Sequence, residues 1–271
     1  MPEGHVIHRL AGELDAAFAG RPVRVSSPQG RFADAAALLD GRTFAGADAY
    51  GKNLFLGFAG APEFVHIHLG LIGKLRIGPA LPVTTPDTLR LRIEDGRTAA
   101  ELRGPQTCAL ITADEKERVE ILLGPDPLRP GADGALGWAR VTRSARPIAS
   151  LLLDQRVAAG VGNIYRCEAL FRARLHPLTP GNQVTRRRWN RIWADLVALM
   201  PLGVADGRID TVRPEHGPEA TGRPPRVDRH GGEVSVYRRQ GMPCLVCGRP
   251  VSMRMLEGRT LYWCSRCQAS R

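Results

Sequence analysis

Four of the six cysteines lie near the C-terminal end of the chain, in two pairs of the form Cys-x-x-Cys. Cys244 and Cys247 form the first pair, and 16 residues separate it from the second, Cys264 and Cys267. Two such tight turns direct four thiolates at one ion, as in a tetrahedral structural zinc site. Disulfides are the alternative, but the chain shows no apolar signal peptide that would indicate an oxidising compartment. The sequence therefore predicts one structural Zn²⁺ per chain.

The 16 residues between the pairs resemble a β-hairpin. The β-like runs VSMRMLEG and RTLYWC meet at a turn made of Glu257, Gly258 and Arg259, which predicts a zinc ribbon. An arginine at the tip of such a hairpin can reach a phosphate, although a solvated turn residue is the simpler alternative. The two remaining cysteines, Cys108 and Cys167, have apolar neighbours and are expected to be small core residues.

The net excess of positive charge lies entirely in the second half of the chain. The 271 residues include 38 Lys and Arg and 27 Asp and Glu, a formal net charge of +11. Residues 1–130 hold 15 basic and 16 acidic residues, whereas residues 131–271 hold 23 and 11, a net charge of +12. Solubility and a GC-rich genome could explain abundant arginine, but not the difference between the halves. The asymmetry favours a polyanionic partner, most simply nucleic acid.

The hydrophobic pattern divides the chain into a β-rich first part and a helical second part. Residues 3–19 have the apolar spacing of a helix, short β-like runs fill residues 22–112, and a short helix is expected over residues 114–122. Alternating strands such as TLRLRIED predict a β-sandwich or barrel. No run of about 18 apolar residues indicates a membrane span.

After a Pro- and Gly-rich stretch, helical patterns cover residues 147–159, 164–175 and 185–200, and residues 213–233 have the composition of a loop. The expected fold is a multidomain α+β protein with an N-terminal β-sandwich flanked by helices, a helical domain and a C-terminal zinc-ribbon hairpin. The predicted boundaries are 1–123 for the β domain, 124–137 for a linker, 138–233 for the helical domain and 234–271 for the zinc finger.

The chain begins Met1-Pro2-Glu3, which allows an N-terminal nucleophile. Removal of Met1 before the small Pro2 would leave a free secondary amine. Because an α-amino group titrates near pH 8, part of it is unprotonated at neutral pH and can attack a sugar C1′ to form an iminium. Glu3 could carry the proton. On its own this signal is weak, because many chains begin Met-Pro by chance.

Further motifs follow in one order along the chain. They are Gly51-Lys52 before a strand, HLGLIG (68–73), LLGPDPL (122–128) and LLLDQRVAAGVGNIYRCEALF (151–171). Together with the PEG start and the cysteine pairs, they resemble the formamidopyrimidine-DNA glycosylase/endonuclease VIII family over essentially the whole chain. The resemblance implies a helix–two-turn–helix motif in the helical domain and damaged DNA as the partner. The PEG start is typical of the endonuclease VIII side.

The resemblance also implies an activity and a set of roles. Family members remove oxidised bases and cut the strand by β,δ-elimination, in which Pro2 is the nucleophile and Glu3 the proton donor and acceptor. Lys52 matches a phosphate-binding lysine at the active site. The remaining roles fall on the DNA-binding residues: phosphate contacts for Asn163 and Arg259, intercalation for Leu71 and an acidic linker position near the active site for Asp126.

Each role has a structural alternative. Lys52 could be a surface residue, Asn163 only a helix cap, and Asp126 only a turn former between two prolines. His66 and His68 alternate onto one strand face, where packing or hydrogen bonding is favoured over a metal pair. Among the arginines, phosphate contacts are also considered for Arg143, Arg146 and the group Arg186, Arg187 and Arg188.

Two departures from the family pattern concern the site. The usual start has a glutamate where this chain has Val6, preceded by His5. The formamidopyrimidine side adds an Arg and a Phe from a D-x-R-R-F-G turn, but residues 101–106 are ELRGPQ, without Phe. The opposite-base preference of that side therefore does not carry over.

The sequence favours a DNA glycosylase and AP lyase acting on oxidised pyrimidines. The alternatives are an oxidised-purine glycosylase, acting on 8-oxoguanine or formamidopyrimidines, and a non-catalytic damaged-DNA binding protein on the same scaffold. Retention of both Pro2 and Glu3 favours the enzyme. Action as a monomer, without a redox cofactor and in the cytoplasm near the nucleoid, is the accompanying expectation.

Overall fold

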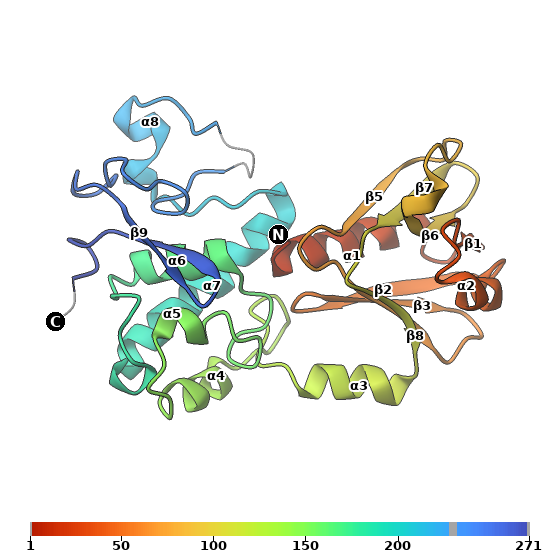
Figure 1. Ribbon diagram of the computed structural model, residues 1–271, viewed down its shortest axis with the longest axis horizontal. Helices are drawn as coiled ribbons and strands as arrows, with labels where there is room; N and C mark the ends of the chain where they lie inside the picture. The colour runs from red at the N-terminus through yellow and green to blue at the C-terminus, as the bar shows by residue number, and fades with distance from the viewer. Residues whose placement is uncertain (1, 228–231, 270–271) are drawn as a thin grey trace. The chain divides into compact units, whose positions relative to one another are not determined.

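The computed structural model describes residues 2–227 and 232–269 of the chain. Met1, whose removal is expected, lies outside these residues, as do positions 228–231 of the expected loop. The chain forms two compact units. We call Met1–Pro2 with Val6–Leu122 the sandwich unit, and Glu3–His5 with Leu123–Arg271 the helical unit. Figure 1 shows the elements of each unit.

Two four-stranded antiparallel sheets form the sandwich unit, which confirms the predicted β-sandwich. One sheet has the order β1-β6-β7-β5 and the other β2-β3-β4-β8. The apolar residues that alternate along the strands fill the core between them. The strand bounds are β1 Arg24–Ser26, β2 Phe44–Tyr50, β3 Asn53–Phe58, β4 Phe64–His68, β5 Lys74–Pro79, β6 Leu89–Glu94, β7 Thr98–Arg103 and β8 Thr107–Ile111.

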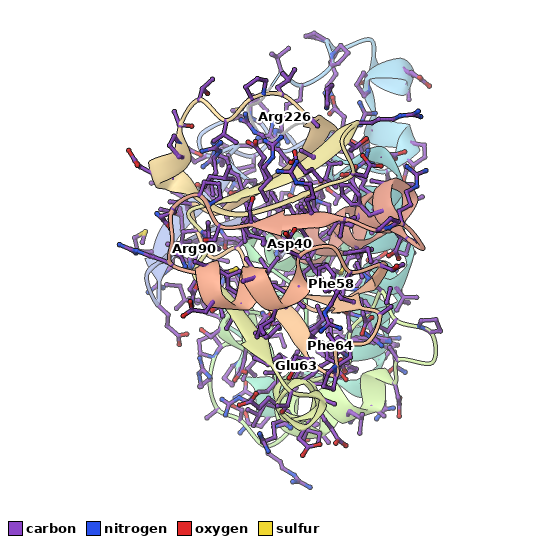
Figure 2. All side chains as sticks on the ribbon, turned by 90° about the vertical axis from the view of Figure 1, so that its right-hand side faces the viewer. Asp40, Phe58, Glu63, Phe64, Arg90 and Arg226 are labelled. Atoms are coloured by element: carbon purple, nitrogen blue, oxygen red, sulfur yellow. The ribbon has the colours of Figure 1, made fainter. Side chains whose placement is uncertain are left out.

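Three α-helices and a short 3₁₀ turn accompany these strands: α1 Gly4–Phe18, α2 Ala33–Leu39, α3 Ala113–Ile121 and η1 Pro86–Thr88. The predicted helices at residues 3–19 and 114–122 are confirmed, but α2 interrupts a stretch expected to be β only. Its sequence ADAAALL explains this, because alanine and leucine have high helix propensity. Asp40 follows α2 and accepts the backbone N–H of Val25 at 2.8 Å; Figure 2 labels Asp40.

An ionic network lies on the β1-β6-β7-β5 sheet of the sandwich unit. Arg92 is 7% exposed and pairs with Glu94 at 2.6 Å and with Glu101 at 2.5 Å. Arg103 pairs with the second oxygen of Glu101 at 2.9 Å. Arginines of β6 and β7 thus meet carboxylates on their own strand and on the neighbouring one.

The helical unit contains five helices, two 3₁₀ turns and a hairpin among its described residues. Their bounds are α4 Gly134–Val141, α5 Ile148–Leu151, α6 Asn163–Arg172, η2 Gly181–Gln183, α7 Arg186–Asp206, η3 Pro214–His216, α8 Pro218–Thr221, β9 Ser252–Leu256 and β10 Arg259–Trp263. The hairpin is antiparallel, as predicted. No described helix combines the length and the apolar character that a membrane span needs.

Four predictions in this unit differ from the structure. Helix α7 continues to Asp206, beyond the predicted end at residue 200, and residues 213–233, expected to be a loop, contain η3 and α8. The helix expected over residues 147–159 ends at Leu151, because the Asp154 side chain accepts the backbone N–H of Arg156 and holds a turn instead. The expected linker ends before residue 134, because Asp133 caps α4 by accepting the N–H of Ala135 at 2.8 Å.

The core of the helical unit is built around Trp189 of α7, which is fully buried. Its indole N–H donates to the carbonyl of Gly134 at 2.8 Å. Gly134 and Gly137 let α4 approach closely, since a Cβ atom would lie 2.6 Å from the ring of Trp193 or 2.8 Å from that of Trp189. The tryptophans of 185–200 are therefore packing residues.

Candidate active site and nucleic-acid interface

Glu3 is buried, and its carboxylate lies at the N-terminus of α6. Oε2 accepts the N–H groups of Gly162 and Tyr165 at 3.0 and 3.3 Å, and Oε1 accepts that of Ile164 at 2.7 Å. The first N–H groups of a helix have no partner within the helix, and the helix dipole favours a negative charge there. A Cβ on Gly162 would lie 2.4 Å from Glu3, so glycine is needed at this position. The segment Glu3–His5 is thereby fixed on the helical unit.

Asn163 is the first residue of α6, while the cap position belongs to Gly162. The cap-only alternative for Asn163 is therefore wrong. Its Nδ2 donates to the carbonyl of Thr260 at 2.9 Å, and its Oδ1 accepts a hydrogen bond from Arg166. These two bonds fix the orientation of the amide and leave one N–H for a ligand.

Arg166 connects this helix end to the zinc-ribbon hairpin. The side chain is fully buried and also donates to the carbonyls of Ala149 and Thr260, both at 3.4 Å. Burial lowers the pKa of Arg166, and the positive charge of Arg259 acts in the same direction. The charge of Arg259 is therefore close to the end of α6 that bears Asn163.

Arg259 is the first residue of β10, paired with Leu256 across the hairpin. At the preceding turn, Glu257 has a positive φ of 46° and pairs with Arg146 at 2.9 Å. Arg146, for which a phosphate contact was one expectation, thus helps to hold the hairpin turn.

Glu168 anchors the segment that leads into the cysteine pairs. This fully buried carboxylate accepts the hydroxyl of Thr211 at 2.6 Å and three consecutive backbone N–H groups, from Ser235 to Tyr237, at 2.8 to 2.9 Å. Such a carboxylate replaces the solvation of three backbone donors at once. Thr211 and residues 235–237 are thus attached to α6.

The four cysteines predicted to bind metal come together. All four Sγ atoms lie within 4.8 Å of one another, with 3.9 Å between Cys244 and Cys267 and 3.4 Å between Cys247 and Cys264. Zinc–sulfur bonds of about 2.3 Å in a tetrahedron give sulfur separations of about 3.8 Å. The donor set and its spacing fit a structural metal site. Among the described residues, no other cluster of possible ligands is found.

The other two cysteines are core residues, as expected. Cys167 is fully buried in α6 and Cys108 lies half-buried in β8. Burial raises the pKa of each thiol to about 12, so neither is a thiolate at neutral pH.

In the sandwich unit, Lys52 lies in the turn between β2 and β3. Burial lowers the pKa of His68 and the charge of Lys52 lowers it further, while a hydrogen bond that His68 donates to Gln106 raises it. The Nε2 atom of His66 lies 2.9 Å from Oδ1 of Asn53, to which it donates a hydrogen bond, and the His66 ring stacks on that of Phe55. The packing interpretation of the two histidines is confirmed, and Lys52 is placed beside them. Pro2 is half-buried at the start of this unit.

Leu71 and Ile72 lie at the tip of the turn between β4 and β5, with 64% and 79% of their surfaces exposed. The turn is closed by the N–H of Gly73, which donates to the carbonyl of Leu69 at 3.0 Å. A Cβ on Gly73 would lie 2.2 Å from that oxygen, so only glycine fits. Two large apolar side chains are thereby held out in solvent, as an intercalating role requires.

Asp126 is 1% exposed and accepts the backbone N–H of Leu128 at 2.9 Å. The structure therefore shows the turn that was its structural alternative, and a role near DNA stays a prediction. His5 is also buried, edge-on to the ring of Tyr165, and burial lowers its pKa to about 4. Val6, which replaces the family glutamate, is half-buried against the sandwich core.

Comparison with known proteins agrees with this geometry. Residues 1–107 match the formamidopyrimidine-DNA glycosylase N-terminal domain, and residues 123–213 match its H2TH domain. The chain belongs to the formamidopyrimidine-DNA glycosylase/endonuclease VIII family. The protein is accordingly a base-excision DNA glycosylase with AP lyase activity.

Individual relatives of the glycosylase cover most or all of its chain. "Endonuclease 8 1" of Mycobacterium tuberculosis is 45% identical over 272 residues, which covers 99% of this chain and 100% of the relative. The formamidopyrimidine-DNA glycosylase of Thermus thermophilus is 37% identical over 86% of this chain and 85% of its own. The MutM (Fpg) structure from Thermus thermophilus superposes with a TM-score of 0.75 at 31% identity, covering 100% of both chains. The Lactococcus lactis Fpg, solved with abasic-site DNA, has a TM-score of 0.80 at 22% identity, covering 99% of this chain and 100% of the other.

Sequence reasoning found the residues that carry chemistry but missed the ones that hold them. Arg166 and Glu168 lie in the motif of residues 151–171, but the sequence assigns neither of them a role of its own. Arg166, three residues after Asn163, lies on the same helix face, a signal that could have paired them. No signal in the sequence linked Glu168 to residues 67 to 69 positions later.

Proposed function

We propose that this glycosylase excises oxidised pyrimidines and cuts the DNA by β,δ-elimination, with the amine of Pro2 as nucleophile. One observation carries the proposal: the carboxylate of Glu3, next to Pro2 in the chain, is fixed at the same end of α6 as Asn163. A proton carrier and a phosphate ligand thus share one helix turn. Damaged DNA is the partner.

The reaction begins when the flipped nucleotide presents its C1′ to the Pro2 nitrogen. The C1′–N bond forms as the glycosidic bond breaks, and the base leaves with a proton for which Glu3 is the donor. The amine then loses its proton and the C1′–O4′ bond breaks, which opens the sugar ring and leaves an iminium that acidifies the C2′ proton. Its removal expels the 3′ phosphate, a second elimination expels the 5′ phosphate, and water then releases the sugar fragment and regenerates the amine.

The phosphate ligands are Lys52, Asn163 and Arg259, which hold the backbone around the lesion. Leu71 fills the space left by the flipped base, as apolar wedges do in kinked DNA. Asp126 lies at the acidic linker position near the site. Zn²⁺ is the metal we assign to the four-cysteine cluster, where its only task is to hold the hairpin that presents Arg259.

The substrate class rests on the relatives. The 45% identity to an endonuclease VIII over the full chain supports oxidised pyrimidines, and the ELRGPQ stretch lacks the Phe of the formamidopyrimidine side. The 37% identity to a formamidopyrimidine-DNA glycosylase keeps oxidised purines as the second candidate.

Borohydride trapping tests reaction and lesion together. The natural protein is incubated with duplexes that contain thymine glycol, dihydrouracil, 8-oxoguanine, an abasic site or no damage. We expect a covalent adduct with the abasic site and the two pyrimidine lesions, and little with undamaged DNA. Preference for 8-oxoguanine would overturn the substrate class, and binding without any adduct would favour the non-catalytic alternative. A variant whose Pro2 is blocked by an uncleaved N-terminal tag must lose the adduct; persistence would remove Pro2 as nucleophile.

A further inference from the structure

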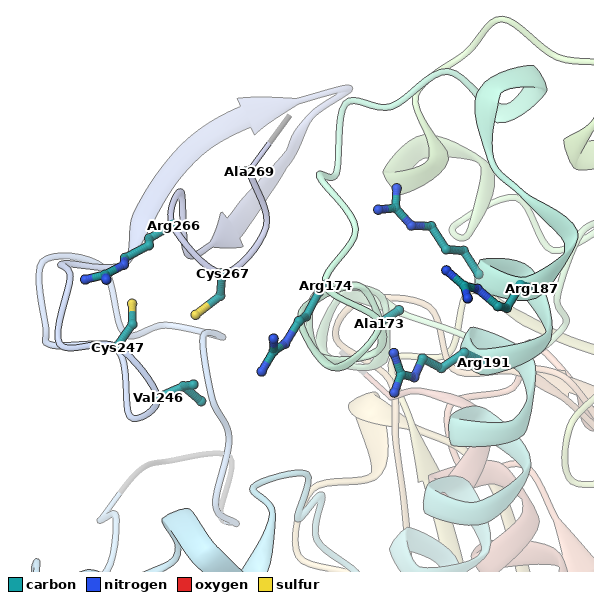
Figure 3. Close-up of a pocket in the computed structure, with 10 residues that line it drawn as sticks. Ala173, Arg174, Arg187, Arg191, Val246, Cys247, Arg266, Cys267 and Ala269 are labelled. Carbon is teal, nitrogen blue, oxygen red and sulfur yellow. The ribbon is translucent and has the colours of Figure 1, made fainter. Parts of the chain in front are cut away.

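An arginine-lined cavity lies in the helical unit, between the end of α6, the start of α7 and the cysteine pairs. Its volume is about 820 Å³. Figure 3 shows Arg174, Arg187 and Arg191 extending from the two helices toward the side on which Cys247 and Cys267 lie. We call it the arginine cavity; its lining is Ala173, Arg174, Arg187, Arg188, Arg191, Val246, Cys247, Arg266, Cys267 and Ala269.

The five guanidinium groups of this cavity have no acidic partner within the described part of the chain. The ion pairs of the helical unit involve other arginines, such as Arg172 with Asp195 at 2.9 Å. Arg186, which directly precedes Arg187, is also engaged elsewhere, since its guanidinium group lies 5.6 Å from the ring centre of Trp138. Five like charges around one concavity repel each other, and an anion from outside the chain would relieve that repulsion.

Arg174 provides a second, independent observation. Its φ is 50°, in the left-handed region that favours glycine at the end of a helix. A non-glycine residue there costs roughly 1 kcal/mol. An arginine at this strained position is therefore best explained by the use of its side chain.

The arginine cavity lies far from the proposed phosphate ligands of the lesion. Asn163 begins α6 and Arg174 lies just beyond its other end, about 15 Å away for a ten-residue helix. Arg259 begins β10, whereas Cys264 and Cys267 follow its last residue, about 16 Å further along. Two elements thus place the cavity at the end opposite to the lesion contacts.

The lining points to phosphates rather than to a peptide or a nucleotide. Its other side chains are small or aliphatic, and no aromatic ring lines the cavity on which a base could stack. An adjoining cavity of about 340 Å³ shares Arg174 and Arg191 and adds Arg172, Arg213 and one acid, Glu215, so basic groups outnumber acidic ones along an elongated surface. Spaced guanidinium groups along a track suit a sugar–phosphate backbone.

We propose that the arginine cavity binds the phosphate backbone of DNA outside the lesion site, an inference that rests on the proposed function. The DNA is either a second duplex, which would allow direct transfer between DNA molecules, or a distant arm of the duplex that carries the lesion. Both sources offer the same phosphates, and the assays below separate them.

The test uses the full-length zinc-loaded enzyme and a non-cleavable abasic analogue in duplexes of 12 and 40 base pairs. If a second duplex binds, dissociation from the labelled 12-mer accelerates severalfold as undamaged 40-mer is added. If a distant arm binds, the 40-mer analogue binds at least fivefold more tightly than the 12-mer. R187Q/R188Q/R191Q should abolish whichever effect the natural enzyme shows, whereas R187K/R188K/R191K should keep it.

The matched control is R24Q/R31Q/R97Q, which removes three exposed charges from the sandwich unit. If the control and R187Q/R188Q/R191Q behave alike in both assays, or if the natural enzyme shows neither effect, the proposal is wrong. Excision from a 12-mer substrate should change less than twofold in all variants; failure of the natural enzyme there would instead overturn the proposed function. R174G guards against misfolding, since it relieves the strain at Arg174: its Tm should not fall, yet the effect should weaken two- to threefold.

Discussion

Arginine is used differently in the two units. In the sandwich unit, Arg92 meets Glu94 and Glu101, and Arg21 meets Asp95 at 3.0 Å, so the charges cancel within the fold. In the helical unit, the five arginines of the arginine cavity have no carboxylate partner among the described residues. These five arginines are part of the net charge of +12 carried by residues 131–271. The described ion pairs of the sandwich unit use arginine to stabilise the fold, whereas the helical unit adds to such pairs a group of five arginines that lacks them.

The largest expected effect separates chemistry from charge. Glu3→Gln should lower base excision and strand cleavage by about 10³- to 10⁴-fold, because the amide cannot donate the proton that a carboxyl group carries. Affinity for abasic-analogue DNA and its salt dependence should stay within about threefold, because the phosphate ligands are unchanged. Single-turnover kinetics and fluorescence anisotropy measure the two quantities.

Glu13→Gln is the matched control for Glu3, because Glu13 is an exposed acid on α1 that pairs with Arg9. It should leave excision unchanged. A comparable loss in both variants, or a loss of DNA affinity equal to the loss of excision in Glu3→Gln, would show that Glu3 acts only by holding α6.

The next effect tests the sandwich arginines. Arg92→Met should lower the free energy of unfolding by about 3 kcal/mol, because it removes the shortest ion pairs of Glu94 and Glu101 in a half-buried site and leaves them only Arg24 and Arg103. Arg187→Met, in the arginine cavity, should cost nothing or raise stability slightly by relieving repulsion. Urea denaturation measures both, and equal destabilisation would break the comparison between the units.

His5 tests a buried group of the helical unit that stays neutral. Burial lowers its pKa from 6.5 to about 4, so between these pH values the unfolded chain binds a proton at His5 and the folded chain does not. This contribution to stability is complete above pH 6.5 and is lost as pH falls toward 4, by about 3 kcal/mol in total. His5→Leu should flatten that part of the stability profile between pH 7 and 4. An unchanged slope would mean that His5 does not couple folding to pH.

The smallest effect concerns orientation rather than charge. Arg166→Lys keeps a cation but loses the planar fork that reaches Asn163, Thr260 and Ala149. We expect abasic-analogue DNA to bind about tenfold more weakly, as for loss of one or two charge-assisted hydrogen bonds. If Asn163→Ala and the double variant weaken binding no further than Arg166→Lys, Arg166 acts through Asn163. Additive losses would assign Arg166 an independent role.

Much of this molecule could be predicted because its patterns are local. The alternation in TLRLRIED, the apolar stripe of α1 and the spacing of the cysteine pairs each depend on residues within one element, and each prediction is confirmed. The role expected for Asn163 has another origin, because it follows from the family resemblance of the motif at residues 151–171 and not from a pattern within one element.

What could not be predicted depends on contacts between distant parts of the chain. The helix expected over residues 147–159 stops early because the side chain of Asp154 accepts a backbone N–H that a helix would use. Gly124 also packs against this segment so closely that a Cβ atom on it would lie 2.2 Å from the carbonyl oxygen of Arg156. The arginine cavity needs Arg174, Arg187 and Arg266 to meet, although they come from three separate elements. No periodicity records such a meeting.

The attachment of Glu3 to α6 has a consequence for the timing of synthesis. Its first ligand, the N–H of Gly162, lies 159 residues further along the chain. At about 5 to 20 residues per second, a ribosome needs roughly 10 to 30 s to cover that distance. The residues made first therefore wait without their final partner until more than half of the protein has emerged. The site is completed late, so a truncated chain that ends before α6 would carry the proposed nucleophile, Pro2, without the helix end that holds Glu3.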